Sequence, residues 1–287
     1  MNPLMPVDTS WFDRSPETYL QREEFLQFQD VADVDFRNLL SEDPHRVQEA
    51  QEKIVSQSKI LNEIRNEHSG YSMPFLTYTQ DFSFAEPIED HNLKLDQLIL
   101  SYDIIDSLRR RHMALSHAIL PNEIRRLSDL RSGNDLVIKN LGSGVGLDVI
   151  NAVTHTNSYV RQVWNYDINP VAIGLGKRIT QYLKERGDLN ENTVAYRKES
   201  FLRSREKADI VLLIGVICGM TDRAASLILK AVYRNLRGGA IVSSSNINMV
   251  EKDPIGPFIV QHLGSPHDPF GDGGSISGPG IQWRSYS

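Results

Sequence analysis

Short apolar runs alternate with stretches of helical spacing along the second half of the chain. Apolar runs bounded by polar or turn-forming residues predict strands at 136–141, 159–166, 193–200, 208–217 and 240–245. Apolar residues three and four positions apart predict helices at 145–153, 169–186 and 222–236. The run at 208–217 is almost entirely apolar, which is typical of a central parallel strand that helices cover on both faces. This order predicts an α/β domain with a parallel-rich sheet and helices on both of its faces.

The first half of the chain shows helical spacing instead. One apolar stripe follows the helix-start signal at 41–44, and a second stripe lies further on; they consist of Val47, Ala50, Ile54, Leu61 and Ile64, and of Leu95, Leu98, Tyr102, Ile105 and Leu108. Between them, the aromatic-rich segment 68–87 contains glycine and proline and predicts an ordered loop or short strands. A polar turn cluster at 131–135 ends this region. We therefore predict a mainly helical segment at 1–132 and the α/β domain at 133–287.

Composition and charge narrow the class of protein. The chain is 40% hydrophobic and 24% charged, as in ordinary globular proteins, and its apolar runs are far shorter than the roughly 20 residues of a membrane span. Its first residues do not resemble a secretory signal, so we expect a cytoplasmic protein with no membrane partner. The single cysteine, Cys218, excludes an intramolecular disulfide and a cysteine-rich zinc site, and we expect no metal. The net charge of −6 disfavours a nucleic-acid partner.

A glycine-rich turn lies where the first predicted strand gives way to a helix. Gly142, Gly144 and Gly146 follow one another at every second position, with Ser143 between the first two. Open parallel sheets bind ligands at such strand ends, and glycine lets the backbone approach a ligand closely. Asp167 ends the second predicted strand, so we expect its carboxylate beside this turn, where it can accept hydrogen bonds from both hydroxyls of a ribose.

A dinucleotide site is the main alternative for this motif. In the G-x-G-x-x-G fingerprint the third glycine would fall at position 147, where this chain has Leu147. The G-x-G-x-G pattern, with Asp167 followed by Ile-Asn-Pro at 168–170, resembles the class I S-adenosylmethionine-dependent methyltransferases. The resemblance covers about residues 135–245 and implies a Rossmann-like fold with S-adenosylmethionine as cofactor.

The resemblance also implies a role for each matching residue. Gly142, Ser143, Gly144 and Gly146 would form the turn past the methionine part of the cofactor, Asp167 would bind the ribose and Ile168 would cover one face of the adenine. Ser200 and Phe201 would approach the adenine edge, whereas Gly215, Val216 and Ile217 would lie beneath the sulfonium. Gly238 and Gly239 match the turn between the last helix and the fifth strand.

One residue departs from the family pattern. Asn140 stands two residues before the first glycine, where the family usually has an acid. The amide keeps a hydrogen-bonding side chain but lacks the charge that would face the ammonium of the cofactor. The family also usually ends its sheet with an antiparallel pair, for which about forty residues follow the fifth predicted strand.

No catalytic base is assigned, because methyl transfer from a sulfonium mainly requires proximity and exclusion of water. His91, His112 and His117 are alternatives for a base, but we interpret each as a surface or packing histidine. Arginines at 109, 110, 111, 125, 126 and 131 are interpreted as a solvated helix surface rather than a phosphate-binding face for RNA.

The resulting hypothesis is a methyltransferase whose substrate is a small molecule. The helical segment would cover the cofactor and select the acceptor, or would join two chains in a homodimer. The alternatives are an RNA or protein methyltransferase, transfer of the aminocarboxypropyl arm of the cofactor, and a non-catalytic S-adenosylmethionine-binding protein with a degenerate site.

Overall fold

The structure is a computed structural model that describes residues 43–67, 72–79, 88–101, 103–131, 135–191, 193–199, 206–217 and 222–244. Contacts divide the chain into two compact units, one that includes the described residues up to Arg109 and one from Arg110 through the last described strand. The domain boundary between residues 132 and 133 stays a prediction. Residues 110–131 lie in the same compact unit as the sheet. No helix of the described residues is long and apolar enough to cross a membrane.

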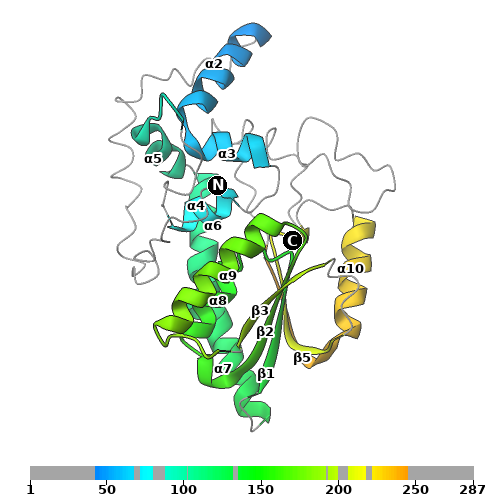
Figure 1. Cartoon of the computed structure of the whole chain (residues 1–287). Coiled ribbons are helices and arrows are strands. Elements are labelled where there is room, and N and C mark those ends of the chain that lie inside the picture. The colour runs from blue at the N-terminus through cyan, green and yellow to red at the C-terminus, as the bar shows by residue number, and fades with distance from the viewer. Residues whose placement is uncertain are drawn as a thin grey trace. The chain divides into compact units, whose positions relative to one another are not determined.

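The second unit is built on a five-stranded, entirely parallel sheet in the order β3-β2-β1-β4-β5. This is the Rossmann-like order: strands are added outward from β1 to β3 on one side, and the next strand, β4, lies on the other side of β1. Figure 1 shows α8 and α9 on one side of the sheet and α10 on the other. The predicted fold class, a Rossmann-like α/β sheet with helices on both faces, is confirmed. The strands are β1 (Leu136–Leu141), β2 (Val160–Asp167), β3 (Val194–Lys198), β4 (Ala208–Ile214) and β5 (Leu236–Ser244).

Helices of the second unit follow the predicted spacing closely. Asn169 caps the amino terminus of α9, where its side-chain oxygen accepts hydrogen bonds from the backbone N–H groups of Val171 at 2.8 Å and Ala172 at 3.2 Å, and Pro170 occupies the first helical position. A π-helical turn, η5, joins α6 to α7. The bounds are α6 (Asp103–Ala114), η5 (Leu115–Ile119), α7 (Leu120–Arg131), α8 (Leu147–Thr154), the 3-10 turn η6 (Asn157–Tyr159), α9 (Pro170–Glu185) and α10 (Asp222–Arg234).

One prediction at the end of the sheet is wrong. Gly238 and Gly239 were expected as a turn, but they lie inside β5, which begins at Leu236. A Cβ on Gly239 would overlap the backbone carbonyl of Asp209 in β4, so the glycine serves a close approach of two strands. The pairing of β4 with β5 shifts register between Ala208 and Ile210 at the same place.

The carboxylate of Asp209 is fully buried at the amino-terminal end of β4. It accepts hydrogen bonds from the backbone N–H of Val137 in β1 at 2.7 Å and from Arg237 in β5 at 2.7 Å, and it also pairs with Arg131 of α7. One buried charge therefore joins three strands and a helix at the end of the sheet opposite the glycine turn. Arg131, expected on a solvated surface, is instead part of this network.

The described elements of the first unit are all helices. They include α2 (Pro44–Gln57), α3 (Lys59–Glu67), α4 (Ser72–Thr79) and α5 (Leu93–Ser101). Helix α4 corrects the expectation of a loop or short strands at 68–87. The buried side chains of Phe75, Leu76 and Tyr78 lie on this helix and not on a strand. The residues of that segment on either side of α4 lie outside the described part.

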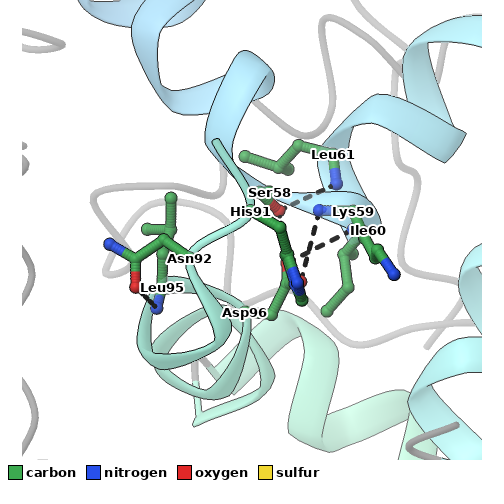
Figure 2. Close-up of polar contacts among 8 residues, drawn as sticks. All are labelled: Ser58, Lys59, Ile60, Leu61, His91, Asn92, Leu95 and Asp96. Atoms are coloured by element: carbon green, nitrogen blue, oxygen red, sulfur yellow. Dashed lines mark hydrogen bonds and ion pairs between the residues drawn. The ribbon is translucent and has the colours of Figure 1, made fainter. Parts of the chain in front are cut away.

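The first apolar stripe does not form one continuous helix. The chain leaves the helical conformation at Ser58, where α2 ends and α3 begins. Figure 2 shows that Asp96 of α5 lies at this break. Its carboxylate accepts hydrogen bonds from the Ser58 hydroxyl at 2.6 Å and from the backbone N–H groups of Lys59 at 3.2 Å and Ile60 at 3.3 Å. A side chain from another helix thus satisfies the first N–H groups of α3, which no contiguous sequence pattern reveals.

His91 completes the surroundings of Asp96, with its Nε2 atom 2.8 Å from the second carboxylate oxygen. Burial raises the pKa of Asp96 above its usual range, and the hydrogen bonds from Ser58 and His91 oppose that rise. The histidine that could have served as a base is therefore held in a structural cluster.

We expect Asp96→Asn to lower the free energy of unfolding of the first unit by about 2 kcal/mol, because the amide offers one acceptor oxygen to donors that a carboxylate satisfies with two. Urea unfolding followed by far-ultraviolet circular dichroism measures this. The matched control is Asp43→Asn at the exposed N-cap of α2, where asparagine caps as well as aspartate and no change is expected. Equal midpoints for Asp96→Asn and the wild type would contradict the role of the carboxylate.

Candidate cofactor site

The turn after β1 requires glycine at three positions. Gly142, Gly144 and Gly146 have φ angles of 64°, 53° and 83°, a region that side chains other than glycine rarely adopt. Space excludes a side chain as well, since a Cβ on Gly142 would lie 2.9 Å from Cγ2 of Val216 and one on Gly146 would lie 2.9 Å from Oδ1 of Asn165. The spacing of the three glycines in the sequence therefore reflects one backbone shape.

Asp167 and the glycine turn meet, as their positions in the sequence predict. The backbone N–H of Gly144 donates to Oδ2 of Asp167 at 2.6 Å, and the N–H of Ser143 donates to the carbonyl of Tyr166 at 2.9 Å. The other carboxylate oxygen accepts from the N–H of Asn169 at 2.8 Å. A carboxylate has about four acceptor sites, so both oxygens of Asp167 retain lone pairs for further donors.

Asn140 lies beneath the turn in a buried pair of amides. It is opposite Asn165 in the register of β1 and β2, and its Nδ2 group donates to Oδ1 of Asn165 at 3.0 Å. The two side chains are 3% and 0% exposed. Asn165 in turn lies against Gly146, so the amide pair supports the floor of the turn. Asn165 was not predicted as a site residue, because an asparagine within a strand matches neither the glycine nor the acid of the motif.

Tyr196 of β3 is a second supporting residue that sequence reasoning missed. Its hydroxyl donates to the carbonyl of Val145 within the turn at 2.8 Å. Burial raises the pKa of Tyr196 well above its usual range, which keeps the phenol protonated as a donor. The ring reaches the turn across Gly176 of α9, where a Cβ would overlap the tyrosine hydroxyl and ring. A glycine inside a predicted helix was the available signal for this close approach.

The carboxyl end of β4 lies on the other side of the turn. Gly215 has a φ of 68°, and the side chain of the next residue, Val216, packs on Gly142. A Cβ on Gly215 would lie 3.6 Å and 3.8 Å from the two terminal nitrogens of Arg111, so this guanidinium lies beside the bare backbone of Gly215. Arg111 was expected on a solvated surface together with Arg126, which is exposed and pairs with Glu123 at 2.6 Å.

Ile168 presents an exposed apolar side chain next to Asp167. Its side chain is 71% exposed, and Val171, one turn further on, is 37% exposed. Two exposed aliphatic side chains beside a hydrogen-bonded carboxylate form a surface that an aromatic base can cover. Ser200 and Phe201, which the resemblance places at the adenine edge, lie outside the described residues, as does Cys218. The cofactor-binding roles of the described residues stay predictions.

His112 is not placed to act as a base. It is 1% exposed, with Nδ1 2.8 Å from Oδ1 of Asp148 and Nε2 3.0 Å from Nδ2 of Asn151. Burial opposes ionisation of Asp148, but the hydrogen bond and charge of His112 and the charge of Arg111 outweigh it, so the pKa of Asp148 is lowered. His112 therefore joins α6 to the first turns of α8.

His117 lies on the surface of η5 with its ring centroid 5.5 Å from that of His155. Partial burial of the ring lowers the pKa of His117, and the neighbouring His155 and His112 lower it further. Among the described residues, no group of three or more histidine, cysteine, aspartate or glutamate side chains could hold a metal ion.

Comparisons with known proteins find structural similarity and no sequence family. No protein-family model matches the chain, and no curated protein matches its sequence. PKMT2 from Rickettsia typhi matches with a TM-score of 0.34 and 22% identity over 44% of this chain, which spans 25% of the PKMT2 chain. Magnesium protoporphyrin IX methyltransferase (ChlM) from Synechocystis PCC 6803 with bound SAM matches with a TM-score of 0.40 and 13% identity, covering 65% of this chain and 72% of ChlM.

A third similar structure is described as a possible exported protein from Bordetella parapertussis, with a TM-score of 0.47, 14% identity, and coverage of 80% of this chain and 73% of that protein. The strand order gives this chain a Rossmann-like fold. The glycine turn and the acid that ends β2 add a motif, so the resemblance to the class I S-adenosylmethionine-dependent methyltransferases is one of fold and motif.

The contact between Gly176 and Tyr196 predicts that replacing glycine by alanine has opposite effects on stability at two positions of α9, Gly176 and Gly174. Gly176→Ala should lower the free energy of unfolding by about 1–3 kcal/mol through overpacking, although alanine favours the helix. Gly174→Ala is the matched control: nothing lies within 4 Å of its Cβ, so the helix should gain about 0.5–1 kcal/mol. Urea unfolding of both variants measures the difference, and stabilisation by Gly176→Ala would show that the ring does not press on this helix.

Proposed function

We propose that this chain is an S-adenosylmethionine-dependent methyltransferase that acts on a small-molecule acceptor. The observation that carries the proposal is the 2.6 Å hydrogen bond from the N–H of Gly144 to Asp167. It brings a bare glycine backbone and a carboxylate with spare acceptor sites to one point at the carboxyl ends of β1 and β2. This is where open parallel sheets of this order bind nucleosides.

The residues present fit an adenosine with an amino acid attached. The glycine turn is a backbone surface that a Cβ at Gly142 or Gly146 would fill, so its shape is kept for close contact. Asp167 retains acceptor sites for two hydroxyls, and the exposed Ile168 adjoins it. The dinucleotide fingerprint is incomplete, because Leu147, the first residue of α8, stands where its third glycine would fall.

When bound, S-adenosylmethionine supplies a methyl group on a sulfonium that a nucleophile can displace in line. The protein's part is to hold and orient. Asp167 would fix the ribose, Ile168 would cover the base, and the turn from Gly142 to Gly144 would hold the remainder against the strand ends. No described side chain is needed as a proton acceptor, since orientation and exclusion of water supply most of the acceleration in such a displacement.

The small-molecule acceptor is supported by the charge of the chain. Its net charge is −6, and two of the arginines considered for RNA binding have local partners, Arg126 with Glu123 and Arg131 with Asp209. An RNA substrate would require a continuous cationic surface instead. We also propose that the helical first unit serves acceptor selection or assembly into a homodimer.

Binding of the cofactor is tested by thermal unfolding and calorimetry. S-adenosylmethionine and S-adenosylhomocysteine should raise the melting temperature, whereas NAD and NADP should not. Asp167→Ala should weaken S-adenosylhomocysteine binding about 10- to 100-fold, because charge-assisted hydrogen bonds to the ribose are lost. Asp129→Ala, which removes an exposed acid of α7, is the charge-matched control and should bind as the wild type does.

Ile168→Ala separates loss of binding from loss of fold. The side chain is 71% exposed, so its removal should leave stability unchanged and weaken binding several-fold through lost apolar contact, about 1 kcal/mol. A wild-type chain that neither S-adenosyl compound stabilises would refute the proposal. Transfer of a labelled methyl group to a small-molecule extract, and not to RNA or protein, then distinguishes the proposed enzyme from a binding protein.

A further inference from the structure

Arg111 places a positive charge at the edge of the glycine turn. Its guanidinium lies beside Gly215, whose backbone bends at a φ of 68° with no side chain in the way. The next residue, Val216, packs on Gly142. Arg111, the end of β4 and the first glycine of the turn therefore lie next to one another.

An acid, a neutral amide and a cation follow one another across the strand ends at the turn. Asp167 ends β2, Asn140 lies in β1 and Arg111 adjoins the end of β4, and β1 lies between β2 and β4 in the sheet. Strands two positions apart in a sheet are separated by about 10 Å. An acid thus lies on one side of the turn and a cation on the other, at a separation that a ribose joined to an amino acid can bridge.

The neutral Asn140 changes which end of an amino acid the site can hold. Its amide is buried and bonded to Asn165, so it offers no charge to an ammonium group. The other acid near the turn, Asp148, lies 2.8 Å from His112 and also interacts electrostatically with Arg111, so groups of the protein already face its carboxylate. A guanidinium, by contrast, matches a carboxylate in charge and in planar geometry.

We propose that Arg111 binds the carboxylate of the amino acid part of the cofactor, and that the site recognises this carboxylate rather than the ammonium. This inference rests on the proposed function and adds the group that selects the amino acid end. Arg111 is a binding residue in it, and the fork of the guanidinium reaches the ligand across Gly215.

Three nucleosides test the assignment by calorimetry: S-adenosylhomocysteine, its decarboxylated analogue, which keeps the amine, and 5′-methylthioadenosine, which lacks both groups. The wild type should bind the first more tightly than the other two, which should bind alike. Arg111→Gln should weaken S-adenosylhomocysteine binding about 10- to 100-fold and leave 5′-methylthioadenosine binding unchanged. Arg111→Lys should retain part of the difference, and Arg126→Gln, the charge-matched control at an exposed position, should retain all of it.

The outcomes separate this inference from the proposed function. If Arg111→Gln weakens all three ligands equally, the residue has only a structural role, and unchanged binding of S-adenosylhomocysteine excludes a contact with the carboxylate. Wild-type preference for the decarboxylated analogue would show that the ammonium is recognised instead. Failure of the wild type to bind any of the three overturns the proposed function itself.

Discussion

The hydrogen bond between the N–H of Gly144 and the carboxylate of Asp167 is the constraint on which the candidate site depends. It joins the turn after β1 to the end of β2 over 2.6 Å. The three glycines of positive φ contribute no side chains that could hold the turn, so contacts from neighbouring strands help to fix its conformation. Asp167 does this from β2, Tyr196 from β3 through the carbonyl of Val145, and Val216 from the end of β4. The shape of the turn therefore follows from the order of the strands.

The two ends of the sheet use a buried or half-buried aspartate in different ways. At the amino-terminal end, the buried Asp209 is held by Arg131, Arg237 and the N–H of Val137, which leaves little acceptor capacity for anything else. At the carboxyl end, the donors to Asp167 within the described part of the chain are two backbone N–H groups, and acceptor sites remain on both oxygens. The same residue type is thus a cross-link at one end of the sheet and a carboxylate with spare acceptor sites at the other, and the neighbouring groups decide which.

The sequence predicted those parts of the structure that local patterns determine. All five strands, the capped start of α9 at Pro170 and the proximity of Asp167 to the glycine turn follow from apolar runs, turn residues and the parallel order of strands. Features that depend on contacts between distant residues were missed. The break at Ser58 is stabilised by the carboxylate of Asp96 from another helix. Gly239 lies in a strand, where the backbone of Asp209 comes too close for a side chain. Glycine in the sequence can mark either a turn or a place where two backbone segments lie very close, and only the three-dimensional packing shows which of the two applies.

The central strand shows why the positioning residues escaped detection. Strand β1 is buried along its whole length, yet it carries the adjacent polar residues Lys139 and Asn140, which point to opposite faces of the sheet. Lys139 donates to the backbone carbonyl of Glu206 and lies 3.7 Å from its carboxylate, and burial lowers the pKa of this lysine. Asn140 instead donates to Asn165, which lies against Gly146 of the turn. Burying polar groups costs free energy unless each is hydrogen-bonded, so a strand chosen for stability alone would be apolar at both positions. The amide pair directly beneath the glycine turn is therefore better explained by what it supports than by what it contributes to the core.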